Sequence, residues 1–234
     1  MLKIKNLGAS AEIYINGDII DDTDAGFMQS WGLNTDGYQW PNDIKAKLDE
    51  CKGKPLTVYI NSDGGSVPAG VAIANMLSRH DMPTTAVVDG WCCSIATQIF
   101  FAAKNRQIPK NAYLMIHKPT VACVGNAEDM RAVADSLDTI QAGLETTYKA
   151  AAKKNVSDEQ IHQMVDKETW LTGEEAAEFF EVEVLDSVQA VARFGATKAS
   201  FKNIPKNINF EKLKNHDKDR VQIALALAKG VNLV

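Results

Sequence analysis

Hydrophobic and polar residues follow two periods along most of the chain, one typical of strands and one typical of helices. Short runs of apolar and β-branched residues predict strands at 11–17, 56–60, 84–88, 113–117 and 182–188. Apolar residues at helical spacing predict helices at 43–51, 67–78, 126–154, 157–164 and 176–180, and another directly after Ser94. A short helix and a loop are expected within 18–40. Strands that alternate with helices indicate an α/β fold.

The length and the change of composition near residue 190 predict the domain organisation. The chain has 234 residues, enough for one domain with a sizeable core and an appendage. Residues 195–219 are rich in Lys, Asn and Asp, as an exposed linker is, and an alanine- and leucine-rich stretch at 220–229 predicts a short helix. We therefore expect a main domain at 1–189 and a C-terminal tail at 190–234.

Charge and cysteine usage exclude several classes of function. A formal net charge of -5 provides no basic surface for nucleic acid. No apolar stretch approaches the roughly 20 residues of a membrane span, and the N-terminus lacks the apolar region of a signal peptide. The four cysteines form no C-x-x-C pair, and the neighbours Cys92 and Cys93 do not bridge readily. We expect no disulfide, no metal site, no cofactor, and a reducing, cytoplasmic setting.

Candidate chemistry lies where predicted strands end, which in open α/β sheets is where sites are built. Ser94 lies between a predicted strand and a buried helix, and we expect Gly90 to make the sharp turn between them. Ser94 can be the N-cap of that helix. It can also be a nucleophile whose reaction creates an oxyanion, which the free N–H groups at the helix start would stabilise. Gly64-Gly65 can be a plain turn or can bring an N–H close to a ligand oxygen. His117 can be a packed core residue or a general base.

Four segments, in their order along the chain, resemble the Clp protease proteolytic subunit family. They are NSDGGSV at 61–67, DGWCCS at 89–94, MIHKP at 115–119 and DKETWLTGEEA at 166–176. The resemblance runs from Glu12 to Val188. It is closest to the phage and prophage branch, the head maturation (prohead) proteases, which share the EIYI start, the GNAEDM segment at 125–130 and the ETW segment near the end.

The resemblance implies a role for each matched residue. Ser94 matches the nucleophile and His117 the general base, while the N–H groups of Gly65 and Ile95 match the oxyanion hole. Glu168 stands where the housekeeping enzymes have the aspartate of the triad, and a glutamate can orient the imidazole in the same way. Asp166 is the alternative acid if the loop is displaced.

The resemblance also implies a fold, an assembly and a substrate. The fold is the ClpP/crotonase-like α/β fold of repeated β-β-α units, with 126–154 as its protruding handle helix. Family members form homo-oligomeric rings, heptamers or stacked heptamers, and the phage branch processes scaffold or capsid proteins in the bacterial host cytoplasm. The chain lacks the long N-terminal segment that works with an ATPase in the housekeeping family, so no unfoldase partner is expected.

Two other functions are compatible with the same fold. A crotonase-like acyl-CoA enzyme would use the Gly-Gly oxyanion hole, but such enzymes usually have acidic residues in place of Ser94 and His117. A catalytically weak or inactive ring-forming assembly subunit is the other alternative, and the glutamate at position 168 leaves it open.

Overall fold

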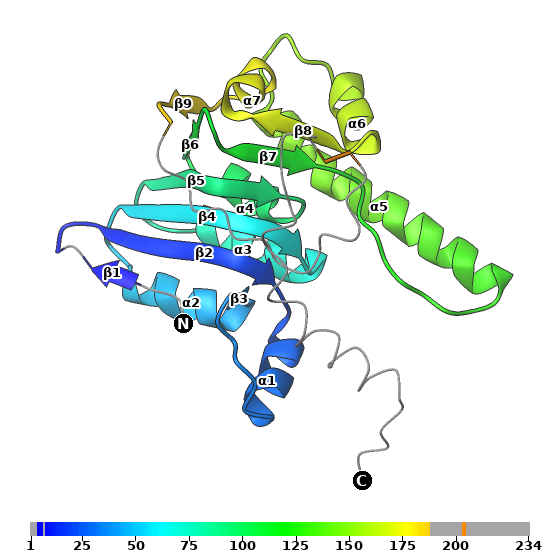
Figure 1. The fold of residues 1–234 in the computed structure, drawn as a ribbon, viewed down its shortest axis with the longest axis horizontal. Helices are drawn as coiled ribbons and strands as arrows, with labels where there is room; N and C mark the ends of the chain where they lie inside the picture. The colour runs from blue at the N-terminus through cyan, green and yellow to red at the C-terminus, as the bar shows by residue number, and fades with distance from the viewer. Residues whose placement is uncertain (1–3, 7, 188–202, 205–234) are drawn as a thin grey trace.

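The computed structural model describes residues 4–6, 8–187 and 203–204, and within them nine strands form one sheet with seven helices packed around it (Figure 1). The strands are β1 (Ile4–Asn6), β2 (Ala11–Ile19), β3 (Tyr38–Gln39), β4 (Leu56–Gly65), β5 (Thr84–Cys93), β6 (Asn105–Pro109), β7 (Tyr113–Ile116), β8 (Thr169–Thr172) and β9 (Glu183–Leu185). The helices are α1 (Asp22–Ser30), α2 (Pro41–Glu50), α3 (Val67–Ser78), α4 (Ala96–Ala102), α5 (Ala127–Ala151), α6 (Asp158–Asp166) and α7 (Gly173–Phe179).

The pairing of the strands places β7 between the carboxyl end of β5 and strand β8. The sheet runs β1-β2-β4-β5-β6-β9, and β2, β4 and β5 are parallel, as strands joined by helical crossovers are. β5 changes its partner along its length, because residues 85–87 pair with β6 and residues 91–93 pair with β7. β7 in turn pairs antiparallel with β8. The carboxyl end of β5 therefore lies beside β7, and β8 lies beyond it.

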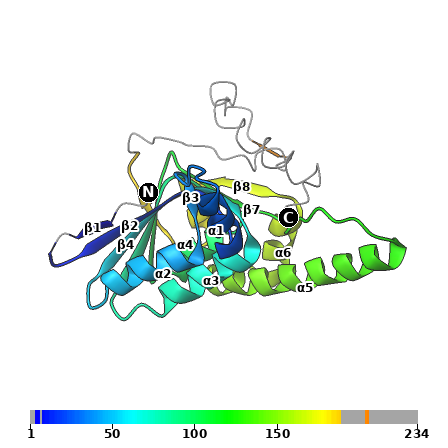
Figure 2. The same ribbon diagram turned by 90° about the horizontal axis from the view of Figure 1, so that it is seen from below.

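The core lies between the sheet and the helices on one of its sides, which include α2, α3 and α5 (Figure 2). Alternate residues of β4, such as Val58 and Ile60, are buried, as the period of a strand requires. Helix α3 adds its apolar face with Ile73 and Leu77. Helix α4 is buried at six of its seven positions, which explains why it carries no charged residue.

Helix α5 projects from the body of the molecule (Figure 1). Its buried residues, Gln141, Glu145, Tyr148 and Ala151, recur at helical spacing and all lie in its second half. A capping box of Asn126 and Asp129 fixes its start. The predicted protruding helix is confirmed, with bounds of 127–151 instead of 126–154.

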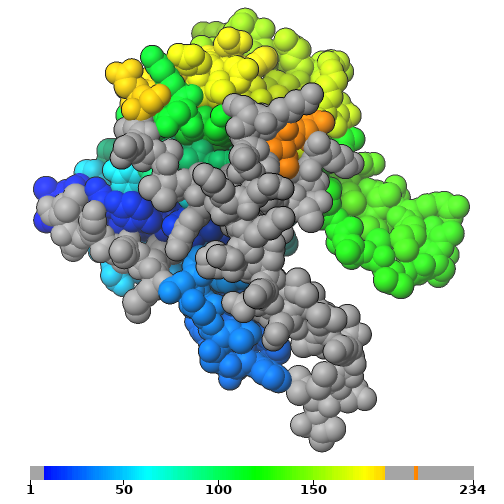
Figure 3. Space-filling view, in the orientation of Figure 1, coloured from blue at the N-terminus to red at the C-terminus, as the bar shows by residue number. Residues whose placement is uncertain are grey.

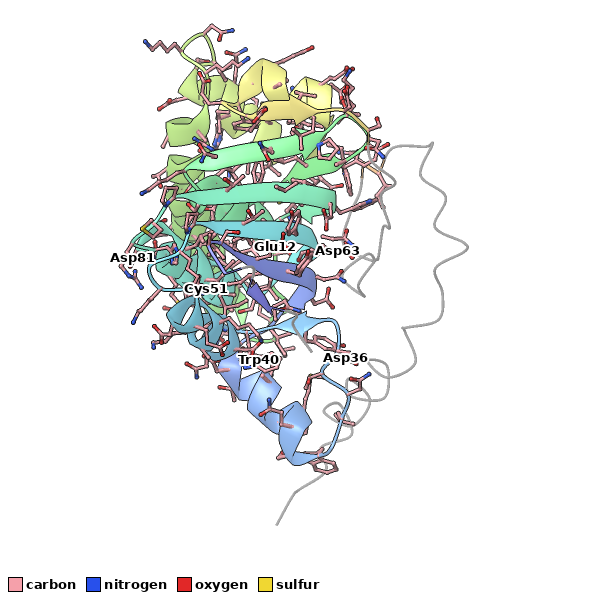
Figure 4. All side chains as sticks on the ribbon, turned by 90° about the vertical axis from the view of Figure 1, so that its left-hand side faces the viewer. Glu12, Asp36, Trp40, Cys51, Asp63 and Asp81 are labelled. Atoms are coloured by element: carbon pink, nitrogen blue, oxygen red, sulfur yellow. The ribbon has the colours of Figure 1, made fainter. Side chains whose placement is uncertain are left out.

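The region at 18–40 contains more structure than a helix and a loop. Helix α1 begins after Asp21, whose side chain accepts a hydrogen bond from the N–H of Asp24. The short strand β3 pairs in parallel with the last two residues of β2. Trp40 and Cys51 flank α2 at its two ends (Figure 4). Pro41 occupies the first position of α2, where its missing N–H has no helical partner to lose.

Several element bounds differ from the prediction. The strand predicted at 56–60 continues to Gly65, and the strand predicted at 84–88 continues to Cys93. Gly90 therefore lies within a strand, and the sharp turn occurs at Ser94 itself. None of the predicted strands corresponds to β1, β3, β6 or β8. The proposed tail at 190–234 lies outside the described residues except for 203 and 204, so the division into a domain and a tail stays a prediction.

Candidate active site

Ser94 occupies a strained turn between β5 and α4. Its φ is 54°, in the left-handed region, and a residue other than glycine held there raises the energy by roughly 1–3 kcal/mol. Hydrogen bonds hold the turn on both sides, because the N–H of Ser94 donates to the Met115 carbonyl at 2.8 Å and the Thr97 hydroxyl donates to the Ser94 carbonyl at 2.6 Å. The N-cap residue of α4 is Ile95, so the Ser94 side chain points to another partner.

That partner is His117, whose Nε2 lies 2.7 Å from the Ser94 Oγ. The pairing of β5 with β7 accounts for the contact. Cys93 lies opposite Met115 in this pair, so the residues that follow each strand emerge side by side. Two residues that are 23 positions apart thus form a hydroxyl–imidazole hydrogen bond, the arrangement that activates a serine nucleophile.

Glu168 is a neighbour of His117 through the pairing of β7 with β8. Strand β8 pairs antiparallel with β7, and Ile116 lies opposite Thr169, so the residue before β8 faces the residue after β7. Glu168 is 9% exposed and, like Ser94, has a φ of 54°. Burial lowers the pKa of His117, and the negative charge of Glu168 opposes this effect by raising it. His117 is therefore held in the neutral form that a base requires.

Asp166, the alternative acid, has different partners. Its carboxylate pairs with the Lys118 ammonium at 2.9 Å and accepts a hydrogen bond from the Gln141 amide at 3.1 Å. The hydrogen bond from Lys118 lowers the pKa of Asp166. Asp166 thus connects the loop after β7 to helix α5, while the charge that acts on His117 belongs to Glu168.

The Gly64-Gly65 turn at the end of β4 lies against the Ser94 turn. A Cβ on Gly64 would lie 2.7 Å from the Ser94 Cβ and 3.2 Å from the Ile95 nitrogen, so side chains are excluded here. Gly65 has a φ of 142° and pairs with Ile19 of β2, whose carbonyl oxygen a Cβ would overlap. The segments that carry the two predicted N–H donors, Gly65 and Ile95, therefore lie next to each other.

A substitution at Gly65 tests this turn. Gly65→Ala is expected to lower the free energy of unfolding in urea by roughly 1–3 kcal/mol or more, because alanine is strained at this φ and its Cβ meets backbone. Gly143→Ala in α5 is the matched control, since its Cβ meets no atom within 4 Å and helix propensity favours alanine by roughly 0.5–1 kcal/mol. Equal stability of wild type and Gly65→Ala would contradict this geometry.

The family model for Clp protease matches residues 46–184, more than half of the chain. The chain belongs to the Clp protease family. ATP-dependent Clp protease proteolytic subunit 1 from Protochlamydia amoebophila is 33% identical over 131 residues, which make up 54% of this chain and 63% of that protein. Proteolytic subunit 3 from Streptomyces coelicolor is 30% identical over 146 residues, 61% of this chain and 66% of that protein. The chain thus spans less than two thirds of each of these two relatives.

A solved structure shows the fold of this Clp protease family member. A ClpP1 mutant from Listeria monocytogenes superposes with a TM-score of 0.60, at 24% identity, and the match covers 76% of this chain and 93% of that one. The predicted ClpP-like α/β fold is confirmed. The narrower assignment to the phage head maturation branch stays a prediction.

The two cysteines before the Clp-type serine position are part of the core. Cys92 and Cys93 are both fully buried, and burial raises the pKa of each thiol. Cys93 packs with Trp91, Met115 and Trp170. A protonated, buried thiol is a poor nucleophile, so neither cysteine is a candidate for that role.

Sequence reasoning missed two residues that contact Glu168. The Trp170 indole Nε1 donates to the Glu168 Oε1 at 3.3 Å, and the backbone N–H of Asn203 donates to the same oxygen at 2.7 Å. No signal in the sequence around 203 indicates this contact, because an Asn in a Lys- and Asn-rich stretch is typical of solvated surface.

Helix α5 forms one wall of an open groove of about 840 Å³, which α3 and α4 complete. Val67 and Pro68, the first residues of α3 after the Gly-Gly turn, line one part of it. Within the described residues we found neither a cluster of side chains suited to a metal ion nor a helix that meets the length and hydropathy of a membrane span.

Proposed function

We propose that the chain is a serine endopeptidase of the Clp type. The observation that supports it most strongly is the 2.7 Å contact between the His117 Nε2 and the Oγ of Ser94, on a turn strained at φ 54°. A strained strand-to-helix turn exposes the serine hydroxyl for attack, which is how the serine of other hydrolases is presented. A helix cap or a packed core histidine would not require this pairing.

The reaction proceeds by acyl transfer. The Ser94 Oγ attacks the carbonyl carbon of the scissile peptide while the His117 Nε2 accepts its proton. Negative charge develops on the carbonyl oxygen, where the N–H groups of Gly65 and Ile95 donate. His117 then gives the proton to the leaving amine, and water, activated by His117 in the same way, hydrolyses the acyl-enzyme.

The charge of Glu168 supports both steps. Its carboxylate stabilises the imidazolium that forms when His117 accepts the proton, and it favours the tautomer with Nε2 free to accept. A glutamate in place of the family's aspartate lengthens this arm by one methylene, and its left-handed backbone at 168 accompanies that change.

The resemblance to the family and to its phage branch supports a proposal for the assembly and the substrate. We propose homo-oligomeric rings, heptamers or stacked heptamers, in which the projecting α5 serves as the handle between rings. We further propose scaffold or capsid protein as the substrate, in the cytoplasm of a bacterial host.

Labelling with a fluorophosphonate probe tests the proposed activity. We expect the wild-type chain to be labelled at Ser94, located by peptide mapping, and Ser94→Ala to remain unlabelled. Ser136→Ala is the matched control, because Ser136 is an exposed serine of α5 whose hydroxyl donates to the Ala132 carbonyl of the same helix. Absence of labelling in wild-type protein that forms rings would refute the peptidase proposal and favour an assembly subunit without activity.

A further inference from the structure

Glu168 is a buried carboxylate on a strained backbone, and such a group needs specific support. A left-handed glutamate costs roughly 1–3 kcal/mol, and a buried carboxylate needs donors to replace water. Two donors bind one oxygen, Oε1: the Trp170 indole at 3.3 Å and the Asn203 N–H at 2.7 Å. The bond from Asn203 is the shorter of the two, and its 2.7 Å is typical of a charge-assisted hydrogen bond.

Asn203 binds this turn at two points. Besides the bond from its backbone N–H to Glu168, its side-chain Nδ2 donates to the Lys167 carbonyl at 2.5 Å. The two donors come from one residue that is 35 positions away in the sequence, and they span the 167–168 peptide. Figure 3 shows residues 203–204, in orange, against the yellow-green atoms of the α6–β8 region.

We propose that Asn203 is a positioning residue for the triad acid, an inference that rests on the proposed peptidase function. Its N–H fixes Oε1 of Glu168, and its side-chain amide holds the Lys167 carbonyl, so the carboxylate keeps its orientation toward His117. A misplacement of about 1 Å in a catalytic group lowers a rate by roughly 100-fold. Asn203 thus supports the site from outside the 12–188 segment that resembles the family.

A shielding role for the same segment would predict other contacts. A segment that blocks the site like a bound substrate would present a carbonyl to the N–H groups of Gly65 and Ile95, beside Ser94. The contacts of Asn203 are donors instead, and they go to the acid and to the residue before it. The direction of these hydrogen bonds indicates that Asn203 holds the carboxylate in place. It does not indicate that Asn203 occupies the position of a substrate.

Three full-length variants separate the two hydrogen bonds. Asn203→Ala removes the side-chain amide and keeps the N–H, Asn203→Pro removes both, and Ile204→Ala is the neighbouring control. The readout is saturable labelling of Ser94 by the fluorophosphonate, which separates the maximal rate from the apparent probe affinity. We expect the maximal rate to fall about fivefold in Asn203→Ala, as for the loss of one neutral hydrogen bond, and about 100-fold in Asn203→Pro. Probe affinity and the control should stay within twofold.

The Glu168→Gln background distinguishes positioning from a general structural effect. In that background Asn203→Pro is expected to have no further effect, since the charge it positions is absent. An unchanged or increased rate in Asn203→Pro, or an equal loss in the Glu168→Gln background, would overturn the positioning role while wild-type labelling at Ser94 still supports the peptidase. Wild-type protein that is not labelled would overturn both.

Discussion

Ser94→Ala and His117→Ala are each expected to lower the kcat for peptide hydrolysis by on the order of 10⁶-fold. The two residues act as one unit, because the hydroxyl is deprotonated only when the imidazole, 2.7 Å away, accepts its proton. The double variant should therefore be no slower than either single variant. The measurement is turnover of a fluorogenic peptide that the wild-type chain cleaves, with circular dichroism to verify folding.

The residual rate of these variants is informative as well. The N–H groups of Gly65 and Ile95 remain in these variants. Their rate of hydrolysis should therefore still exceed the uncatalysed rate in water by about 10³- to 10⁴-fold. Additive losses in the double variant would show that Ser94 and His117 act independently. A rate close to wild type in Ser94→Ala would identify another nucleophile and contradict the site.

Some parts of the fold could be predicted because local chemistry decides them. Helix α3 was predicted with its observed bounds, since Gly64-Gly65 precedes it and its apolar face repeats at helical spacing. The ends of β4 and β5 were not predicted, because their last residues are polar, glycine or cysteine. Ser62 and Asp63, for instance, are among the most buried polar residues, which only the neighbouring strands explain.

The site could be predicted as a set of residues but not as a geometry. The motifs indicated Ser94 and His117, whereas their contact depends on the register of β5 with β7. The same is true of Glu168, which reaches His117 only because β8 pairs with β7. Two non-glycine residues with a φ of 54°, Ser94 and Glu168, are strained by tertiary contacts, and no sequence propensity predicts such a conformation.

Glu168→Gln is expected to lower the rate of Ser94 labelling by roughly 10³- to 10⁴-fold, because an amide lacks the charge that stabilises the His117 imidazolium and permits the wrong tautomer. Glu168→Asp should retain more activity than Glu168→Gln, since it keeps the charge and restores the residue of the housekeeping family. Asp166→Asn makes the same carboxylate-to-amide change at the alternative acid and serves as the control. Its rate of Ser94 labelling should fall by less than about tenfold, because Asp166 pairs with Lys118.

The pH dependence gives a second measure of the same residue. Burial lowers the pKa of His117, so wild-type labelling should decline only below about pH 6.5, the usual value for histidine. Glu168 raises that pKa, and its replacement by glutamine removes the raising effect; the acid limb should then move to lower pH while the maximal rate falls. An acid limb that moves to higher pH, or a larger loss in Asp166→Asn than in Glu168→Gln, would transfer the role of triad acid to Asp166.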